Sequence, residues 1–107
     1  MGDDWTLRDA QAAVDRWISQ WEEGYWPPLA NLARLTEEVG ELAREINHLE
    51  GAKPGPGSAA RVKDEMGDLL FVLITLANSL DVDLSTALQE VLQKYQIRDA
   101  DRFTPRE

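Results

Sequence analysis

The chain of 107 residues contains no cysteine, which excludes disulfide bonds and thiolate metal sites. Its single histidine leaves one Glu-x-x-His motif, from Glu45 to His48, whereas di-iron carboxylate bundles use two. No apolar run reaches the roughly 18 residues of a membrane-spanning helix, and the acidic N-terminus lacks the pattern of a signal peptide. We therefore expect no membrane contact and a cytoplasmic location.

Basic residues are also scarce, since 11 Lys and Arg stand against 20 Asp and Glu, for a net charge of −9. This balance argues against binding of a nucleic-acid polymer, which requires basic patches facing phosphate. It does not exclude a phosphorylated small molecule, because a bound divalent cation can invert the local charge.

No segment shows the alternating pattern of a strand. Apolar residues recur instead at three- and four-residue steps, which predicts an all-α fold, a four-helix bundle in one domain spanning residues 1–107. Thr6, Ser58 and Asp83 are suitable N-caps. The predicted helices are residues 6–22, 28–49, 59–80 and 84–95. A loop rich in Gly and Pro is expected at 51–58, and a loose tail at about 104–107.

Two features concern the predicted core. Trp17 and Trp21 lie on the apolar face of the first predicted helix and are expected to be buried. Residues 69–77 are apolar almost all round, as in a helix that is buried on every side. A chain of this length has difficulty covering such a helix alone, so we expect a homodimer or tetramer with a shared helical core.

Two seven-residue stretches, 37–43 and 64–70, repeat one pattern: acid, Glu, apolar, Gly, acid, Leu, apolar. A glycine inside a helix costs about 1 kcal/mol relative to alanine. The small residues Gly40 and Gly67 would let a metal, a phosphate or a neighbouring helix approach closely, and the sequence does not choose between a ligand and helix packing.

The acids of these stretches pair by helical spacing. Glu38 and Glu41 share one face of their helix, and Glu65 and Asp68 share one face of the other. Like charges at this spacing destabilise a helix, so two matching violations indicate a functional site. Carboxylates are preferred ligands of hard cations, which predicts that these four side chains bind Mg²⁺, with Mn²⁺ as a substitute.

Several further residues could contact a substrate or have an ordinary structural role. Lys94 and Arg98, four residues apart, could hold a phosphate chain or simply occupy an exposed helix end that favours cations. Trp26 lies at a helix end, where an aromatic ring could stack on a base. His48 continues the polar stripe of Glu38, Glu41 and Glu45, so it is either a pocket wall or a helix-end cation.

The spacing Glu38-x-x-Glu41, 23 residues, then Glu65-x-x-Asp68 resembles the E-x-x-E…E-x-x-D signature of the MazG-like all-α nucleoside triphosphate pyrophosphohydrolases. Flanking segments are similar to the single-domain YpjD type of that family, and the similarity covers about residues 5–103. These segments are residues 24–25, 34–38, 41–45, 67–73, 76–80 and 98–102.

The resemblance implies an oligomeric helical bundle that cleaves the α–β phosphoanhydride of nucleoside triphosphates in a Mg²⁺-dependent reaction. The products are a nucleoside monophosphate and pyrophosphate, and the role is house-cleaning of the nucleotide pool. By the same resemblance the four paired acids bind the metal, and Glu38 is also catalytic. Glu37 orients or deprotonates the attacking water, Lys94 and Arg98 contact phosphate, and Trp26 and His48 contact the base.

Two other classes of function remain open at this stage. One is a non-enzymatic helical interaction module whose acids only solvate the surface. The other is a carboxylate-bridged iron protein. Metal dependence distinguishes the three classes, because the module needs no metal and an iron protein would be coloured and redox-active.

Overall fold

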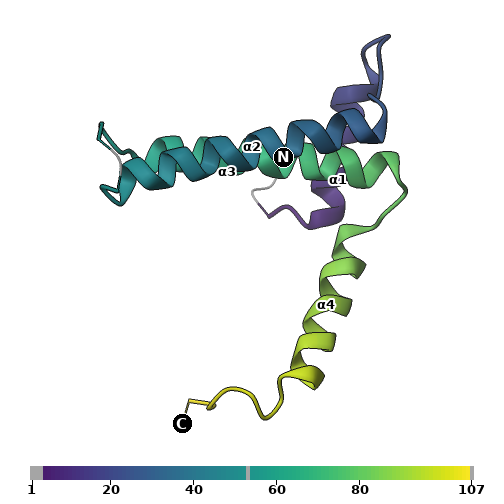
Figure 1. Cartoon of the computed structure of the whole chain (residues 1–107). Coiled ribbons are helices and arrows are strands. Elements are labelled where there is room, and N and C mark those ends of the chain that lie inside the picture. Colours follow the sequence, from purple (N-terminus) through teal and green to yellow (C-terminus); the bar gives the residue numbers. More distant parts are fainter. Residues whose placement is uncertain (1–3, 53, 107) are drawn as a thin grey trace.

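Four helices and no strand make up the part of the chain that the computed structural model describes, residues 4–52 and 54–106 (Figure 1). The prediction of an all-α, four-helix fold is confirmed. The helices are α1 (Leu7–Ser19), α2 (Pro28–Leu49), α3 (Ala59–Ser79) and α4 (Leu84–Arg98).

Local capping explains where three of the helices begin. The Thr6 hydroxyl accepts a hydrogen bond from the Asp9 amide, and the Asp9 carboxylate accepts one from the Thr6 amide, which forms a capping box. The Ser58 side chain accepts a hydrogen bond from the Arg61 amide at the start of α3, and the Asp83 side chain accepts one from the Ser85 amide at the start of α4. The helix α2 instead begins at Pro28, whose fixed φ suits the first helical position.

Two helix ends differ from the sequence prediction by three residues each. The first helix ends at Ser19 rather than residue 22, because the chain turns there and reaches Gly24 with a φ of +59°. The last helix continues to Arg98 rather than residue 95. The prediction stopped too early because the apolar spacing does not extend into the final turn. The described residues 50–52 and 54–58 lie between α2 and α3 and are not helical.

The helices α2 and α3 form a long antiparallel pair, and α1 packs against α3 (Figure 1). The helix α4 leaves this pair at a bend of 102° from α3 and has its principal contact with α1. Within the described ranges, no single helix combines the length and apolar character needed to cross a membrane. Only α3 and α4 taken together meet that test, as a bent pair.

A polar network fixes the turn between α3 and α4 onto α1. The Gln11 amide donates to Asn78 Oδ1 and to the Val82 carbonyl, both at 2.9 Å. Its oxygen accepts from the Leu84 amide at 2.9 Å, and Asn78 in turn donates to the Gln11 carbonyl at 3.0 Å. One side chain therefore connects three helices at the base of α4.

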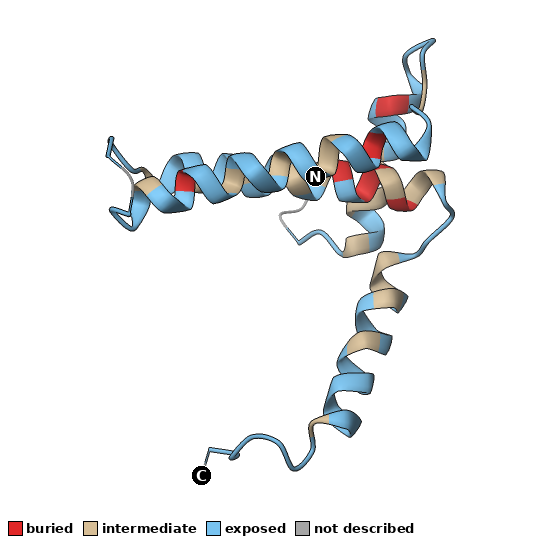
Figure 2. Ribbon diagram, viewed as in Figure 1, coloured by how far each residue is buried: buried red, intermediate tan, exposed pale blue. Residues whose placement is uncertain are grey.

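The buried core of the single chain is small and lies where α1, α2 and α3 meet (Figure 2). Its apolar members are Ile18, Val72, Ile74 and Ala77. The prediction that Trp17 and Trp21 are buried is wrong for the single chain, since they are 54% and 52% exposed. They pack edge to face on each other, with ring centroids 5.6 Å apart.

Much of the apolar face of α2 and α3 is also open to solvent, although its spacing predicted a core. The exposed members are Leu32, Val39, Ile46, Leu49, Met66, Leu70 and Leu73. The apolar spacing predicted which face of each helix is apolar, but no helix among residues 4–52 and 54–106 covers these side chains.

Candidate active site

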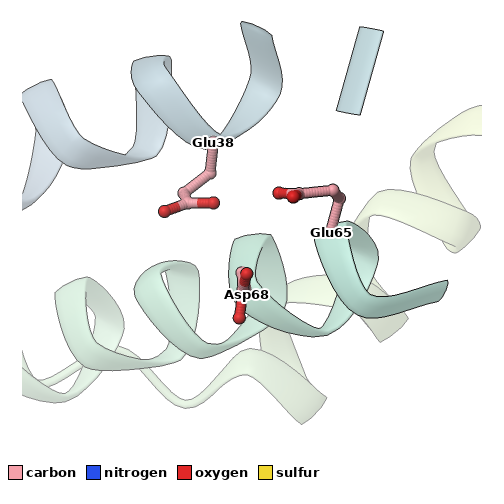
Figure 3. Close-up of side chains that lie close together, drawn as sticks. All are labelled: Glu38, Glu65 and Asp68. Carbon is pink, nitrogen blue, oxygen red and sulfur yellow. The ribbon is translucent and has the colours of Figure 1, made fainter. Parts of the chain in front are cut away.

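Three carboxylates from two helices converge between α2 and α3. Glu38 of α2 and Glu65 and Asp68 of α3 each offer an oxygen, and these oxygens lie within 4.8 Å of one another (Figure 3). Glu38 and Glu65 are half-buried, and Asp68 is exposed. The three-residue spacing on α3 and the antiparallel packing of α2 bring them together, so this is a group that could hold a cation.

The fourth predicted ligand, Glu41, is not part of that group. Its side chain is exposed and lies 3.7 Å from the Arg44 guanidinium, one turn further along α2. Helical spacing predicted which face of α2 carries Glu41, but the direction of its long side chain depends on the neighbouring cation.

The acids are electrostatically unfavourable without a counter-ion. Partial burial and the charges of Asp68, Glu38, Glu41 and Glu45 together raise the pKa of Glu65. Each contribution disfavours the ionised form of Glu65. A divalent cation in the group would reverse this effect by stabilising the ionised carboxylates.

Next to the carboxylates lies an aromatic cleft of about 240 Å³, between the C-terminal end of α1 and the α2–α3 pair. Arg34 lies over two of its rings, 5.9 Å from the centroid of Trp26 and 5.8 Å from that of Phe71. Arg34 precedes Glu38 by four residues, and Phe71 follows Asp68 by three. The cleft and the carboxylates are therefore about one helical turn apart. The cleft is lined by Trp17, Ile18, Trp21, Glu23, Gly24, Tyr25, Trp26, Asn31, Arg34, Phe71 and Thr75.

The two predicted base contacts do not come together in one chain. Trp26 precedes the first residue of α2 and lines the aromatic cleft, whereas His48 lies in the last turn of α2. At 1.5 Å per residue, they are about 30 Å apart along the helix. The His48 ring is half-buried against the loop, and its Nδ1 atom is buried without a hydrogen-bond partner among the described residues.

Lys94 and Arg98 both lie in α4, with Arg98 as its last residue. Because α4 points away from the α2–α3 pair, they are not beside the carboxylates of their own chain (Figure 1). The Arg98 guanidinium donates two hydrogen bonds to Asp99, at 3.2 and 2.9 Å, and stacks 4.6 Å above the Tyr95 ring. The pairing with Asp99 raises the pKa of Arg98.

The repeated glycines and Glu37 occupy open positions. A Cβ added to Gly40 or Gly67 would meet no heavy atom within 4 Å, so packing inside the chain does not require a glycine at either place. Glu37 is exposed beside Glu38 on α2. The space around these residues is available to a ligand or to a second copy.

The sequence analysis did not predict two features of the site region: the position of Arg34 over the aromatic rings and the burial of Glu45. Arg34 could have been found from its position four residues before Glu38. Glu45 was recognised as part of the polar stripe, but it is only 6% exposed, and nothing in the spacing indicated that. Its burial depends on how α2 and α3 pack.

Comparisons with known proteins identify relatives of this chain by sequence and by fold. The sequence model of the MazG nucleotide pyrophosphohydrolase domain matches residues 27–103. The chain is similar to the Bacillus subtilis protein YpjD, with 53% identity over 106 residues, covering 97% of this chain and 96% of that protein. It is also 36% identical over 84 residues to dCTP pyrophosphatase 1 of Rattus norvegicus, covering 74% of this chain and 47% of that enzyme.

Two solved structures share the fold. The crystal structure of Bacillus subtilis YpjD is 52% identical with a TM-score of 0.81, covering 88% of this chain and 98% of that one. A Bacillus-conserved MazG protein, described as a nucleotide pyrophosphohydrolase, is 48% identical with a TM-score of 0.78, covering 88% of this chain and 93% of that one. With a family match over most of its length and relatives that share its arrangement of helices, the chain belongs to the MazG nucleotide pyrophosphohydrolase family.

Proposed function

We propose that this protein hydrolyses nucleoside triphosphates at the α–β phosphoanhydride, releasing a nucleoside monophosphate and pyrophosphate. The observation that carries the proposal is the group formed by Glu38, Glu65 and Asp68 across two helices of a MazG chain. A role in clearing surplus or non-standard nucleotides follows from this reaction, because it removes triphosphates from the pool used for synthesis.

The donor set fits Mg²⁺, with Mn²⁺ as a substitute, because all three ligands are carboxylates and hard cations prefer oxygen. Glu41 would complete the set if its side chain left Arg44 and rotated toward the group. When bound, the cation neutralises the triphosphate oxygens and favours attack by water on phosphorus. No thiol is present for covalent catalysis, and none is required.

Glu37 is proposed as the residue that orients the attacking water and accepts its proton. It is adjacent to Glu38 on α2, exposed, and lies beside the open space at Gly40. A carboxylate at this position can act as a general base without being a ligand of the cation.

The aromatic cleft is proposed as the base end of the site. Trp26 and Phe71 offer ring faces for stacking, and Arg34 between them can reach a phosphate or a base edge. The relationship to dCTP pyrophosphatase 1 makes dCTP the first substrate to test. The proposed contact of His48 with a base requires a second copy, because His48 lies at the other end of α2.

Lys94 and Arg98 are proposed as phosphate contacts supplied by a second copy of the chain. Between residues 94 and 106 the chain carries four basic and two acidic side chains, whereas α2 and α3 carry the acids. The exposed apolar face of α2 and α3 and the open apolar cleft at α4 would be covered in the same assembly. That cleft has a volume of about 280 Å³ and is lined by Leu7, Leu73, Leu84, Ala87, Leu88 and Val91.

The test is a panel of nucleoside triphosphates with Mg²⁺ or Mn²⁺, assayed for pyrophosphate and monophosphate. Glu38→Ala and Asp68→Ala should abolish release, and Glu37→Gln should slow turnover by roughly 10²–10⁴-fold, the usual effect of losing a general base. Release of orthophosphate and a diphosphate would identify a different bond. No turnover of any nucleotide would favour the interaction module instead.

A further inference from the structure

Two polar side chains are buried in the wall of the aromatic cleft. Asn31 of α2 is 2% exposed and Thr75 of α3 is 5% exposed, and both line the cleft. A polar group removed from water is costly unless it is hydrogen-bonded, and apolar side chains of similar size would pack there without that cost. The hydrogen bonds that these two groups make, and those that they leave open, therefore indicate what the cleft can bind.

Both side chains use a donor within the protein. The Thr75 hydroxyl donates to the Phe71 carbonyl at 2.8 Å, so its oxygen can only accept from a ligand. The Asn31 amide nitrogen donates to the Trp26 carbonyl at 3.4 Å, and the opposite orientation of the amide would place two oxygens against each other. Because 3.4 Å is longer than a normal N–H···O hydrogen bond, this contact only weakly compensates the burial of the amide. Asn31 still has its acceptor oxygen and a second N–H for a ligand.

A third hydroxyl in the cleft follows the same pattern. Tyr25 lines the cleft, and its hydroxyl donates to Asp15 Oδ1 at 2.7 Å. The other side-chain donors in the described lining are the Arg34 guanidinium and the tryptophan indoles, which belong to half-buried or exposed side chains that water can reach. The buried side chains of the cleft thus present acceptors, together with the second N–H of Asn31.

The position of these acceptors suits the base of a nucleotide. Asn31 precedes Glu38 by seven residues on α2, and Thr75 follows Asp68 by seven on α3. The antiparallel register that brings the two acids together therefore also sets Asn31 near Thr75, two helical turns or about 10 Å further along the pair. Phosphates held at the carboxylates would leave the base of the same nucleotide at this end of the cleft.

We infer that Asn31 and Thr75 select nucleotides whose base carries an exocyclic amino group beside a ring nitrogen, which is the edge of cytosine or adenine. The amino group donates hydrogen bonds that the Asn31 and Thr75 oxygens can accept, and the neighbouring ring nitrogen can accept the free N–H of Asn31. Uracil and hypoxanthine place a carbonyl oxygen at the same position, where it would face acceptors with no hydrogen atom between them. The inference rests on the proposed function for the placement of a nucleotide in the cleft, and it adds the residues that choose the base.

The competing explanation for the two residues is purely structural. Asn31 lies in the first turn of α2 and Trp26 precedes that helix, so the amide could serve only to hold the chain at the helix start. Thr75 could likewise serve only to bond back to its own helix, as the exposed Thr36 does by donating to the Leu32 carbonyl. In that case substitution would change the stability of the protein but would affect all bases equally.

The experiment compares substrate pairs of the same shape that differ in an amino group or a carbonyl at the recognised position: dCTP with dUTP, and dATP with dITP. Pyrophosphate release at low substrate concentration gives kcat/KM for each. We expect the native protein to prefer the amino member of the pair that it cleaves by roughly 10–100-fold, because the wrong base leaves buried acceptors unpaired. The pair that is cleaved distinguishes a cytosine edge from an adenine edge.

Two variants remove the acceptors and keep the approximate size of the side chains, Asn31→Leu and Thr75→Val. The preference for the amino member should fall toward one in both variants, with the larger loss in Asn31→Leu because Asn31 makes two of the inferred contacts. The matched control is Thr36→Val, which removes the same kind of hydroxyl-to-carbonyl bond outside the cleft and should keep the native preference. If Asn31→Leu does not fold, Thr75→Val alone carries the comparison.

Binding of nucleoside monophosphates provides a readout that does not depend on cleavage, since dCMP, dUMP, dAMP and dIMP contain no phosphoanhydride. Trp17, Trp21 and Trp26 line the cleft, so a base that enters it should quench tryptophan fluorescence. We expect the same amino preference in the dissociation constants of the native protein, and its loss in Asn31→Leu.

Equal or reversed preference within both pairs would overturn the inference and leave the proposed hydrolysis intact. An unchanged preference in Asn31→Leu and Thr75→Val, with lower melting temperatures, would assign both side chains to the structural role, and absence of quenching by every monophosphate would also contradict the inference. Tighter binding of dCMP than dUMP, or of dAMP than dIMP, without cleavage of any triphosphate would support the inferred recognition and refute the proposed function.

Discussion

If the phosphate contacts come from a second copy, two inactive variants should restore each other's activity when mixed. The first variant, Glu38→Gln, damages the carboxylate group and leaves α4 intact. The second, Lys94→Gln with Arg98→Gln, does the reverse. The reason is geometric: α4 points away from the α2–α3 pair of its own chain, so each site would combine α2 and α3 of one copy with α4 of another (Figure 1).

The expected size of the recovery follows from counting the sites. Random exchange of an equimolar mixture makes half of the dimers hybrid, and each hybrid has one site with both halves intact. Activity should therefore recover to about a quarter of that of the native dimer. If both halves of a site belonged to one chain, every site in every hybrid would carry a mutation, and no recovery would occur.

The assay is pyrophosphate release after the subunits have been exchanged and hybrids have been counted by native mass spectrometry. The control mixture is Glu38→Gln with Asp68→Asn. Both of those mutations damage the carboxylate group, so every site in their hybrids is defective and recovery should be absent. Hybrids of the test pair that form but stay inactive would refute the shared site, as would full activity of the Lys94→Gln, Arg98→Gln variant alone.

Four further outcomes are expected. Excess Mg²⁺ should raise the melting temperature according to RT ln(1 + [L]/Kd), and Glu38→Gln should reduce the rise; identical calorimetric scans in EDTA and Mg²⁺ would count against a cation site. Gln11→Ala should cost roughly 1–3 kcal/mol in urea unfolding, because it leaves the partly buried Asn78 side chain and Leu84 amide without their partner, and an unchanged midpoint would contradict that. Hydrogen bonds from Arg8 hold the pKa of Asp83 below its ordinary value of 3.8, so the stabilisation is complete above that pH and is lost as the pH falls through the lowered pKa. Asp83→Asn should therefore destabilise the protein at neutral pH, with a difference that vanishes in acid unfolding curves. Gly67→Ala should stabilise α3 by about 1 kcal/mol, since its Cβ meets open space, and a lower melting temperature would show that something occupies that space.

The helices and their starts were predictable because their causes are local. Thr6, Ser58 and Asp83 cap the residues immediately after them, and the apolar spacing needs no knowledge of the rest of the chain. The helix ends were less predictable. The first helix stops at Ser19 because of the turn toward Gly24, and a pattern that includes Trp21 cannot reveal that turn.

Contacts between helices were predicted only where spacing on both helices defined them. Glu38, Glu65 and Asp68 meet because each lies on the face that its own helix turns to the other. The periodicity that placed Trp17 and Trp21 on one helix face did not specify the angle between α3 and α4, or which apolar faces a single chain leaves open. The interhelical angle and the exposed apolar faces depend on packing over the whole chain and on any second copy.

The carboxylates of α2 and α3 each stand one residue before a member of the exposed apolar face, so burial of that face affects the site. Glu38 precedes Val39, and Glu65 precedes Met66, so each acid lies about 100° around its helix from an apolar side chain that solvent still reaches. Any surface that covers Val39 and Met66 must therefore pass beside the carboxylates and form a wall of the site. The hydrophobic effect would position that wall, and the cations would remove the repulsion among the acids behind it. A chain of this size can then build a water-excluding site from two helices, because the remaining walls come with the surface that buries its apolar face.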